Sequence, residues 1–263
     1  MIWTSWHNHT GDGPRFSYCA DSDLTPETYR RMLRDGPWRA FALTEHAFAL
    51  GIDADDRPWP GEWYHEPERL WKNRAFREDK TAIFLERLGT VCDGDKIFGG
   101  LEVEVAYDGS LSMEPVLWPY LHVVIGSIHY LPGERHTWCG AHMMQLNMLL
   151  CHPIDILGHP FRALAGAGPA PDEIIDETLI CARDAGVAIE INAHYPFARD
   201  AHVLARAVAL GVRVAFGLDA HHRRELKLHT YFEQVLRDSG VDFNQIRQFH
   251  PIRKAPKPKV LVR

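Results

Sequence analysis

Seven short apolar runs are spaced along this chain, and stretches with helical character separate most of them. Most runs contain β-branched or aromatic residues, which is typical of strands buried on both faces. The runs cover residues 2–7, 40–45, 97–105, 121–129, 154–158, 187–192 and 212–218. Strands that alternate with helices in units of about 30 residues favour parallel pairing with right-handed crossovers. The sequence therefore predicts an α/β fold in which seven units close into a barrel.

Helix signals occupy the gaps between these runs. Thr25-Pro26-Glu27 opens the first helix with a cap, a proline at the first helical position and an early acid. Gly186 and Gly211 directly follow two other helical stretches, where a left-handed C-cap belongs. Further helices are therefore expected at 66–88, 141–150, 171–185, 199–210 and 224–238.

Six of the seven runs end in residues that commonly bind metal ions. The endings are His7-Asn8-His9, Thr44-Glu45-His46, Glu102-Val103-Glu104, Ser127-Ile128-His129, Gly158-His159-Pro160 and Asp219-Ala220-His221. The chain has 16 histidines, and they are dispersed rather than clustered as in a tag. In α/β barrels the chemistry lies at the carboxyl ends of the strands. The pattern predicts one polynuclear metal site at that mouth of the barrel.

The residue types at these strand ends indicate the chemistry. His7 and His9 are two residues apart, so strand alternation puts both rings on one face. A mixed set of imidazoles and carboxylates suits Zn, Mn or Fe. Closely spaced ions lower the pKa of a bound water and hold the oxygens of a phosphate ester. The sequence contains neither G-x-S-x-G nor a P-loop, so a serine hydrolase and an NTPase lose their main support.

Length, charge and cysteine content restrict the remaining choices. A chain of 263 residues can form one α/β barrel, so residues 1–263 are expected to be a single domain. A net charge of −6 favours neither long nucleic acids nor a membrane surface. We expect no signal peptide and no membrane span. The five scattered cysteines lack a C-x-x-C motif, which favours a reducing compartment and hence a cytoplasmic location.

Two stretches interrupt the alternation of strands and helices. Residues 51–65 combine glycine, proline, acids and tryptophan, which predicts a long loop near the active-site mouth. Trp59, Trp63 and Tyr64 in this loop either contact an organic leaving group or pack the loop down. Residues 251–263 form a basic, proline-rich segment, which predicts a semi-extended tail.

The ordered motifs H-N-H-T, L-T-E-H, G-L-E, G-S-I-H, L-G-H-P and G-L-D-A-H resemble the polymerase and histidinol phosphatase (PHP) superfamily. The resemblance spans residues 7 to 221, and the T-E-H and Y-C-A-D-S segments bring it closest to the histidinol-phosphate phosphatase branch. It implies a distorted (β/α)7 TIM-like barrel with two or three divalent ions. It also implies a phosphomonoesterase that attacks a small phosphorylated metabolite with a metal-bridging hydroxide.

The resemblance further implies nine metal ligands in three groups. They are His7, His9, Glu102 and Asp219 for the first ion, Glu102, His129 and His159 for the second, and Asp21, His46 and His221 for the third. Glu102 would bridge the first two ions. Glu102, Asp219 and His221 would take direct part in catalysis.

Some of these assignments have rivals in the sequence. Asp12 competes with Asp21, because the gap from His9 to Asp21 is longer than the family pattern. Glu104 shares a strand face with Glu102, although Glu102 matches the G-x-E position. Asn192, at the end of the sixth run, is either a polar group behind the metals or a turn residue.

A phosphate group also needs cationic partners. Arg162 follows His159 by three residues, and Arg223 follows His221 by two, so both are expected near the mouth. A guanidinium group matches phosphate geometry in a bidentate manner. Arg162, Arg223 and His194 are therefore the expected substrate contacts.

Three other functions remain as alternatives. They are a phosphodiesterase or nuclease on the same scaffold, a metal-dependent amidohydrolase and a non-catalytic metal-binding protein. The expected partner is a small phosphorylated substrate, and the sequence leaves the oligomeric state open.

Overall fold

The computed structural model describes residues 1–13, 16–17, 19–51, 80–105, 109–113, 115–129, 131 and 137–252. The expected loop at 51–65 lies outside these residues except for its first position. The expected helix at 66–88 lies outside them up to position 79. Only the first two positions of the expected tail at 251–263 are described, so the predictions for the loop, its aromatic residues and the tail stay predictions.

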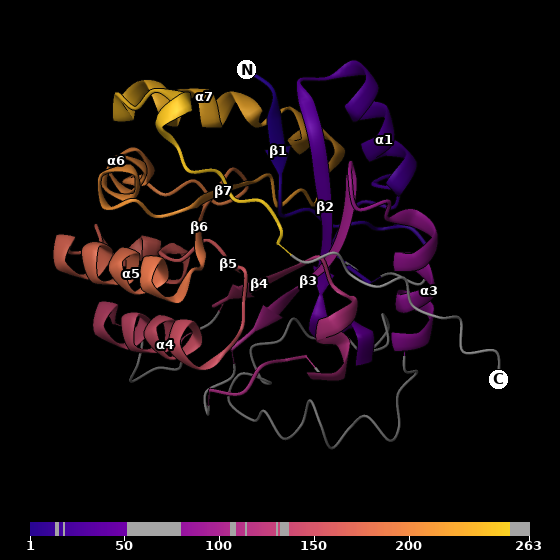
Figure 1. Ribbon diagram of the computed structural model, residues 1–263, viewed down its shortest axis with the longest axis horizontal. Coiled ribbons are helices and arrows are strands. Elements are labelled where there is room, and N and C mark those ends of the chain that lie inside the picture. The colour runs from indigo at the N-terminus through magenta and orange to yellow at the C-terminus, as the bar shows by residue number, and fades with distance from the viewer. Residues whose placement is uncertain are drawn as a thin grey trace.

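Seven parallel strands form one sheet in the order of the sequence. The strands are β1 (Trp3–Ser5), β2 (Trp38–His46), β3 (Ile97–Glu104), β4 (Val123–Ser127), β5 (Ile156–Leu157), β6 (Ala188–Asn192) and β7 (Val214–Gly217). Hydrogen bonds from Trp6 N to Phe216 O (2.8 Å) and from Asp219 N to His7 O (2.7 Å) join the first and last strands. The sheet therefore closes into a distorted (β/α)7 barrel, as the sequence predicts (Figure 1).

The α-helices surround this barrel. They are α1 (Pro26–Asp35), α3 (Thr81–Val91), α4 (Trp138–Cys151), α5 (Asp172–Ala185), α6 (Asp200–Leu210) and α7 (His229–Ser239). Short 3-10 helices cover Ala47–Gly51, Pro115–Tyr120, Arg162–Ala167, Arg223–Lys227 and Phe243–Gln245. Figure 1 shows α4, α5 and α6 along one side of the strands, with α1 and α3 on the opposite side. No helix in the described ranges is long and apolar enough to cross a membrane.

Local signals explain the helix ends. Thr25 accepts a hydrogen bond from Thr28 N and caps α1, and Gly186 and Gly211 end α5 and α6 at φ of 69° and 72°. The continuous helix expected at 224–238 is wrong. A 3-10 turn comes first and α7 begins at His229, because Glu225 caps that turn by accepting from His222 N.

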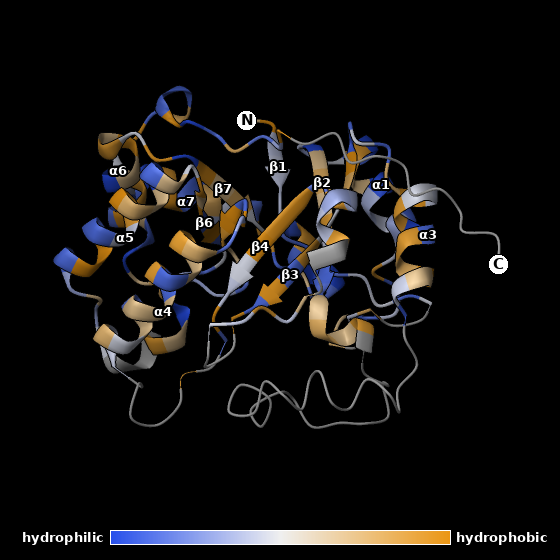
Figure 2. Cartoon of the chain, turned by 60° about the horizontal axis from the view of Figure 1, so that its bottom comes forward, coloured by the Kyte–Doolittle hydropathy of each residue, from blue (hydrophilic) through white to orange (hydrophobic). Residues whose placement is uncertain are grey.

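The core has two layers, because strand side chains alternate between the faces of the sheet. Ala40 and Ala42 belong to a cluster that also contains Trp6 and Phe98, whereas Phe41 lies in the larger cluster. Figure 2 shows hydrophobic residues along β3 and β4, while α5 carries both hydrophilic and hydrophobic residues. Small alanines inside the barrel leave room for large polar side chains farther along the same strand faces.

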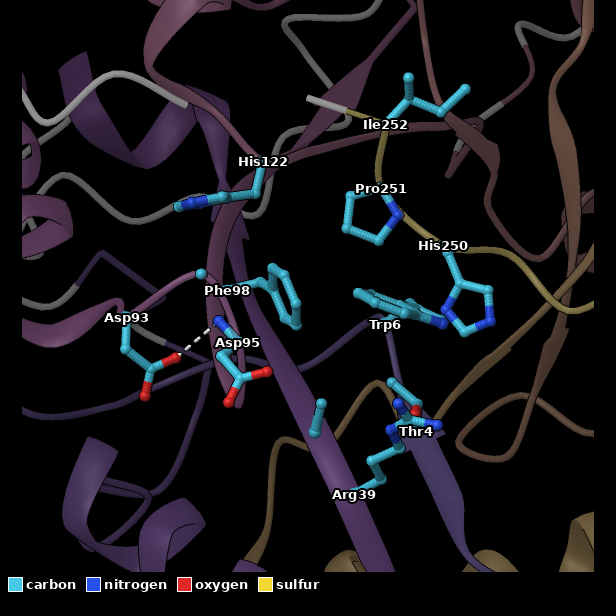
Figure 3. Close-up of a pocket in the computed structure, with 12 residues that line it drawn as sticks. Thr4, Trp6, Arg39, Asp93, Asp95, Phe98, His122, His250, Pro251 and Ile252 are labelled. Atoms are coloured by element: carbon cyan, nitrogen blue, oxygen red, sulfur yellow. Dashed lines mark hydrogen bonds between the residues drawn. The ribbon is translucent and has the colours of Figure 1, made fainter. Parts of the chain in front are cut away.

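The two ends of the barrel differ in chemistry. The amino ends of β2, β3 and β4 border a cavity of about 590 Å³, which is lined by Trp6, Arg39, Asp95, Phe98 and His122, among others (Figure 3). The strand-end histidines and carboxylates lie at the carboxyl ends of the strands. This polarity places the candidate site at the mouth where barrel enzymes carry out their chemistry.

Candidate metal centre

Glu102 lies at the centre of a ring of histidines. Its side chain projects from β3 on the interior strand face and is fully buried. Its two carboxylate oxygens lie close to five imidazole nitrogens. The distances are 2.8 Å to His46 Nδ1, 3.1 Å to His159 Nε2, 3.3 Å to His129 Nε2, 3.4 Å to His7 Nε2 and 3.6 Å to His9 Nε2. Five histidines from the ends of four strands, β1, β2, β4 and β5, thus converge on one carboxylate.

Asp219 is the second carboxylate of the site. Its Oδ1 lies 3.0 Å from His9 Nε2 and 3.5 Å from His7 Nε2, and its Oδ2 accepts a hydrogen bond from Asn192 at 3.1 Å. Asp219 has a φ of 50° and His159 has a φ of 25°. Residues other than glycine rarely adopt such positive backbone angles. Such backbone strain clusters at functional sites, where the surrounding contacts maintain it.

The buried carboxylates and imidazoles of this site shift one another's pKa values. Burial alone would raise the pKa of Glu102 and of Asp219, but the surrounding histidines hold both pKa values well below the usual range. Burial lowers the pKa of His9 and His159, and lowers that of His221 to about 3. Burial also acts to lower the pKa of His7 and His46, but the carboxylates of Asp219, Glu190 and Glu102 beside His7, and of Glu102 beside His46, hold both pKa values well above the usual range. The site therefore presents ionised carboxylates beside both neutral and protonated imidazoles, and a bound ion would replace the ring protons that face the carboxylates.

The spacing of these groups fits divalent ions. Several triplets of ligand atoms lie within 4.8 Å of one another, including His7 with His159 and Asp219, Glu102 with His129 and His159, and His9 with His46 and His221. Ligand atoms at about 2.1 Å from a tetrahedral ion are about 3.4 Å apart, which is close to the separations around Glu102. His7 Nε2 is buried and makes no hydrogen bond to any described residue. The donor set thus fits a polynuclear metal site.

The structure brings together eight of the nine predicted ligands. They are His7, His9, His46, Glu102, His129, His159, Asp219 and His221. Asp21 lies at the edge, where its carboxylate is 3.0 Å from His222 Nδ1 and accepts a hydrogen bond from Arg223 N. Its rival Asp12 pairs with Arg87 at 2.7 Å. The role of Asp21 as a ligand stays a prediction.

Other carboxylates hold the ligands from behind. Glu104, the rival of Glu102, lies 2.6 Å from His129 Nδ1. Glu45 accepts from Ser17 Oγ at 2.6 Å, and Ser17 Oγ lies 3.0 Å from His9 Nδ1. These contacts orient the rings so that each Nε2 points toward Glu102.

The predicted substrate contacts differ in their surroundings. Arg162 lies over the Tyr195 ring at 3.4 Å from its centroid, and its Nη1 is buried without a hydrogen-bond partner among the described residues. His194 Nδ1 lies 3.0 Å from a Glu225 carboxylate oxygen, in a group with His221 that could also hold an ion. Arg223 is more than half exposed and pairs with Asp23 at 3.4 Å. Arg162 is thus the arginine whose environment best fits phosphate binding.

Sequence reasoning missed two residues that lie beside the ligands. The Tyr195 ring lies 5.7 Å from the His159 ring, and burial raises the pKa of Tyr195 to about 12. No motif marks this tyrosine. Glu190 lies behind His7, and it did leave a signal, because it is an acid within an apolar run, two residues before Asn192 on the same strand face.

The curated relatives of this chain match about half of it. No family model matches. Over 151 residues the chain is 27% identical to the DNA polymerase/3'-5' exonuclease PolX of Bacillus subtilis (strain 168), covering 56% of this chain and 26% of that protein. Over 158 residues it is 25% identical to a probable phosphatase of Thermoanaerobacter sp. (strain X514), and this match covers 57% of this chain and 62% of that protein. The chain therefore spans less than two thirds of the length of these relatives.

Structural similarity covers nearly the whole chain. The histidinol phosphate phosphatase of Lactococcus lactis, solved with zinc, L-histidinol and phosphate, superposes with a TM-score of 0.55 over 95% of this chain and 96% of that one, at 19% identity. At this identity the likeness concerns the fold. The superfamily that the ordered motifs resemble is named after polymerases and histidinol phosphatases, and both kinds of protein are among the matches. The chain therefore has the same barrel fold as the Lactococcus lactis enzyme, as its motifs predict.

Proposed function

We propose that this protein is a metal-dependent phosphoesterase, and more closely a phosphomonoesterase that acts on a small phosphorylated metabolite. The observation that carries the proposal is the convergence of five histidines and Asp219 around the buried carboxylate of Glu102. The matches to a probable phosphatase and to a histidinol phosphate phosphatase support the same class of reaction.

Two or three divalent ions are the proposed cofactors. His7, His9, Glu102 and Asp219 would hold one ion, and His129 and His159 would hold a second with Glu102. His46 and His221 would hold a third, with Asp21 as the predicted additional ligand. When bound, the ions supply positive charge for the phosphate oxygens and acidify water near neutral pH. Zinc is the first ion to test, because the Lactococcus lactis enzyme was solved with zinc.

Arg162 would bind the phosphate group of the substrate. Its Nη1 is buried and unpartnered among the described residues, so a phosphate oxygen there would satisfy a donor that otherwise remains unpaired. Stacking on Tyr195 fixes the guanidinium plane beside His159. Arg223 and His194 remain proposed contacts for the rest of the substrate.

At the other side of the site, Asp219 would orient a proton donor, and His221 would turn its Nε2 toward the third ion. The Nδ1 of His221 donates to the Asp219 carbonyl at 2.8 Å, so its Nε2 keeps the free lone pair. Because the pKa of Asp219 is held well below its usual range, this carboxylate stays ionised and can orient a donor next to the phosphate. Glu102 remains the shared carboxylate between both halves of the site.

The substrate class can be tested directly. Purified protein should carry two or three equivalents of Zn, Mn or Fe and should hydrolyse phosphomonoesters, with histidinol phosphate as one panel member because the Lactococcus lactis structure contains L-histidinol and phosphate. His159→Ala should remove both metal and activity. Metal-loaded protein that turns over no phosphate ester would refute the proposal.

The second candidate is a phosphodiesterase or nuclease, which the match to a polymerase with 3'-5' exonuclease activity supports. Parallel assays with a mono- and a diester of the same aryl alcohol separate the two. A higher kcat/KM for the diester would favour the second candidate. A cytoplasmic location and a single domain over residues 1–263 remain part of the proposal.

A further inference from the structure

We propose that Glu190 is a positioning residue that holds two metal ligands from different strands, so that it governs metal affinity without binding an ion. The inference rests on the proposed metal centre. Glu190 lies on β6, is only 3% exposed and faces the barrel interior between Ala188 and Asn192. Each of its carboxylate oxygens contacts a different ligand residue.

The first oxygen orients His7. Glu190 Oε1 lies 2.9 Å from His7 Nδ1, and a carboxylate oxygen can only accept a hydrogen bond. The proton of the ring must therefore reside on Nδ1, which leaves Nε2 as the coordinating nitrogen. Nε2 points to the centre of the site, 3.4 Å from Glu102 Oε2 and 3.5 Å from Asp219 Oδ1. This is the carboxylate–histidine–metal arrangement that fixes tautomer and ring orientation.

The second oxygen holds the backbone of His159. His159 N donates to Glu190 Oε2 at 2.7 Å, at a residue whose φ is 25°. A histidine keeps this unfavourable backbone conformation only where other contacts stabilise it. The bend turns the His159 ring so that Nε2 lies 3.1 Å from Glu102 Oε1. One carboxylate thus sets the direction of a ligand in each half of the site.

The barrel leaves room for this carboxylate. A Cβ added at Gly217 would lie 1.8 Å from Glu190 Oε1, so any larger residue there would displace the acid. Both partners of Glu190 are donors, so the position requires an acceptor on each side. A glutamine offers one acceptor and one donor, and its NH2 group would face either His159 N or His7 Nδ1.

These contacts predict a specific defect in Glu190→Gln. If the amide NH2 faces His7, the ring must accept at Nδ1 and carry its proton on Nε2, which blocks coordination. We expect zinc affinity to fall about 10–100-fold, as is typical for partners behind metal ligands. Asp200→Asn is the matched control, because Asp200 is also a buried acid and bonds to Tyr231 and Phe197 N instead of to a ligand. The control should bind zinc like the wild type.

Two measurements on the chain of 263 residues test the inference. Calorimetric titration measures the zinc affinity of the wild type, Glu190→Gln and Asp200→Asn. A wild-type zinc affinity in Glu190→Gln would overturn the proposal. A loss of zinc affinity in Asp200→Asn as large as in Glu190→Gln would overturn it as well. Nitrogen-15 NMR of the zinc-loaded wild type should show His7 bound through Nε2 with a proton on Nδ1. Coordination through Nδ1 would overturn it even if Glu190→Gln does not fold. A wild type that binds zinc but hydrolyses no phosphate ester would refute the proposed function alone.

Discussion

Gly217→Ala should damage the metal centre from behind. Gly217 ends β7, and a methyl group there would lie 1.8 Å from Glu190 Oε1 and 2.8 Å from His7 Cβ. Overpacking of this kind costs about 1–3 kcal/mol, and a lost hydrogen bond to a charged group costs about 1.5–3 kcal/mol. Because the two effects share one side chain and are not additive, we expect a loss on the order of 3 kcal/mol in the free energy of unfolding.

Gly126→Ala provides the matched control, because it adds the same methyl group to another strand on the opposite face. There the methyl would meet Met148 Sδ at 2.2 Å and Ile154 Cδ1 at 2.8 Å, on the side of α4. Urea unfolding and zinc titration should show both variants destabilised, while zinc affinity falls only in Gly217→Ala. Zinc binding by Gly217→Ala at wild-type affinity would refute the reasoning. An equal loss of zinc affinity in Gly217→Ala and Gly126→Ala would also refute it.

Three further predictions concern pH, substrate and metal. Burial raises the pKa of Asp200 to about 7, so the folded chain keeps a proton that the unfolded chain releases near pH 4. Native stability should therefore fall by up to about 4 kcal/mol between pH 4 and 7, and urea unfolding of Asp200→Asn should lack this slope. Arg162→Met should lower kcat/KM for phosphomonoesters about 10–100-fold, as expected for a lost charge-assisted hydrogen bond, whereas Arg223→Met, whose side chain is exposed and paired with Asp23, should change it less. Zinc at about 100 times its dissociation constant should stabilise the protein by about 2.7 kcal/mol, and a melting temperature unchanged by chelation would contradict a structural contribution of the ions.

The strand-end ligands were predictable from sequence because parallel strands in a closed barrel end at the same mouth. The period of two along a strand also determines which residues share a face, so Glu102 and His46 could be expected to meet. The sequence carries no comparable rule for loops. The position of Asp21 depends on its contacts with His222 and Arg223, which lie some 200 residues away in the chain.

Contacts between side chains of different elements were the part that sequence could not provide. Tyr195 becomes relevant only because Arg162 stacks on it. The start of α7 was misplaced because Glu225 caps the preceding turn by accepting from the backbone of His221 and His222. Local propensity favours a continuous helix there, but this short-range capping contact starts a separate 3-10 turn instead.

Some metal ligands lie at the seam where β1 and β7 meet to close the barrel. Ion binding there should therefore affect the rates of folding and unfolding. Ser5 Oγ accepts from Leu218 N across this seam, which joins positions 213 residues apart. Contacts of such long sequence separation form late, because the chain must first close the loop between them. His7 and His9 follow the first strand, and Asp219 follows the last. An ion held by all three would therefore stabilise the contacts between β1 and β7, which form late in folding. Zinc should therefore slow unfolding much more than it accelerates folding, which would give the loaded protein a long lifetime even where its equilibrium stability is modest.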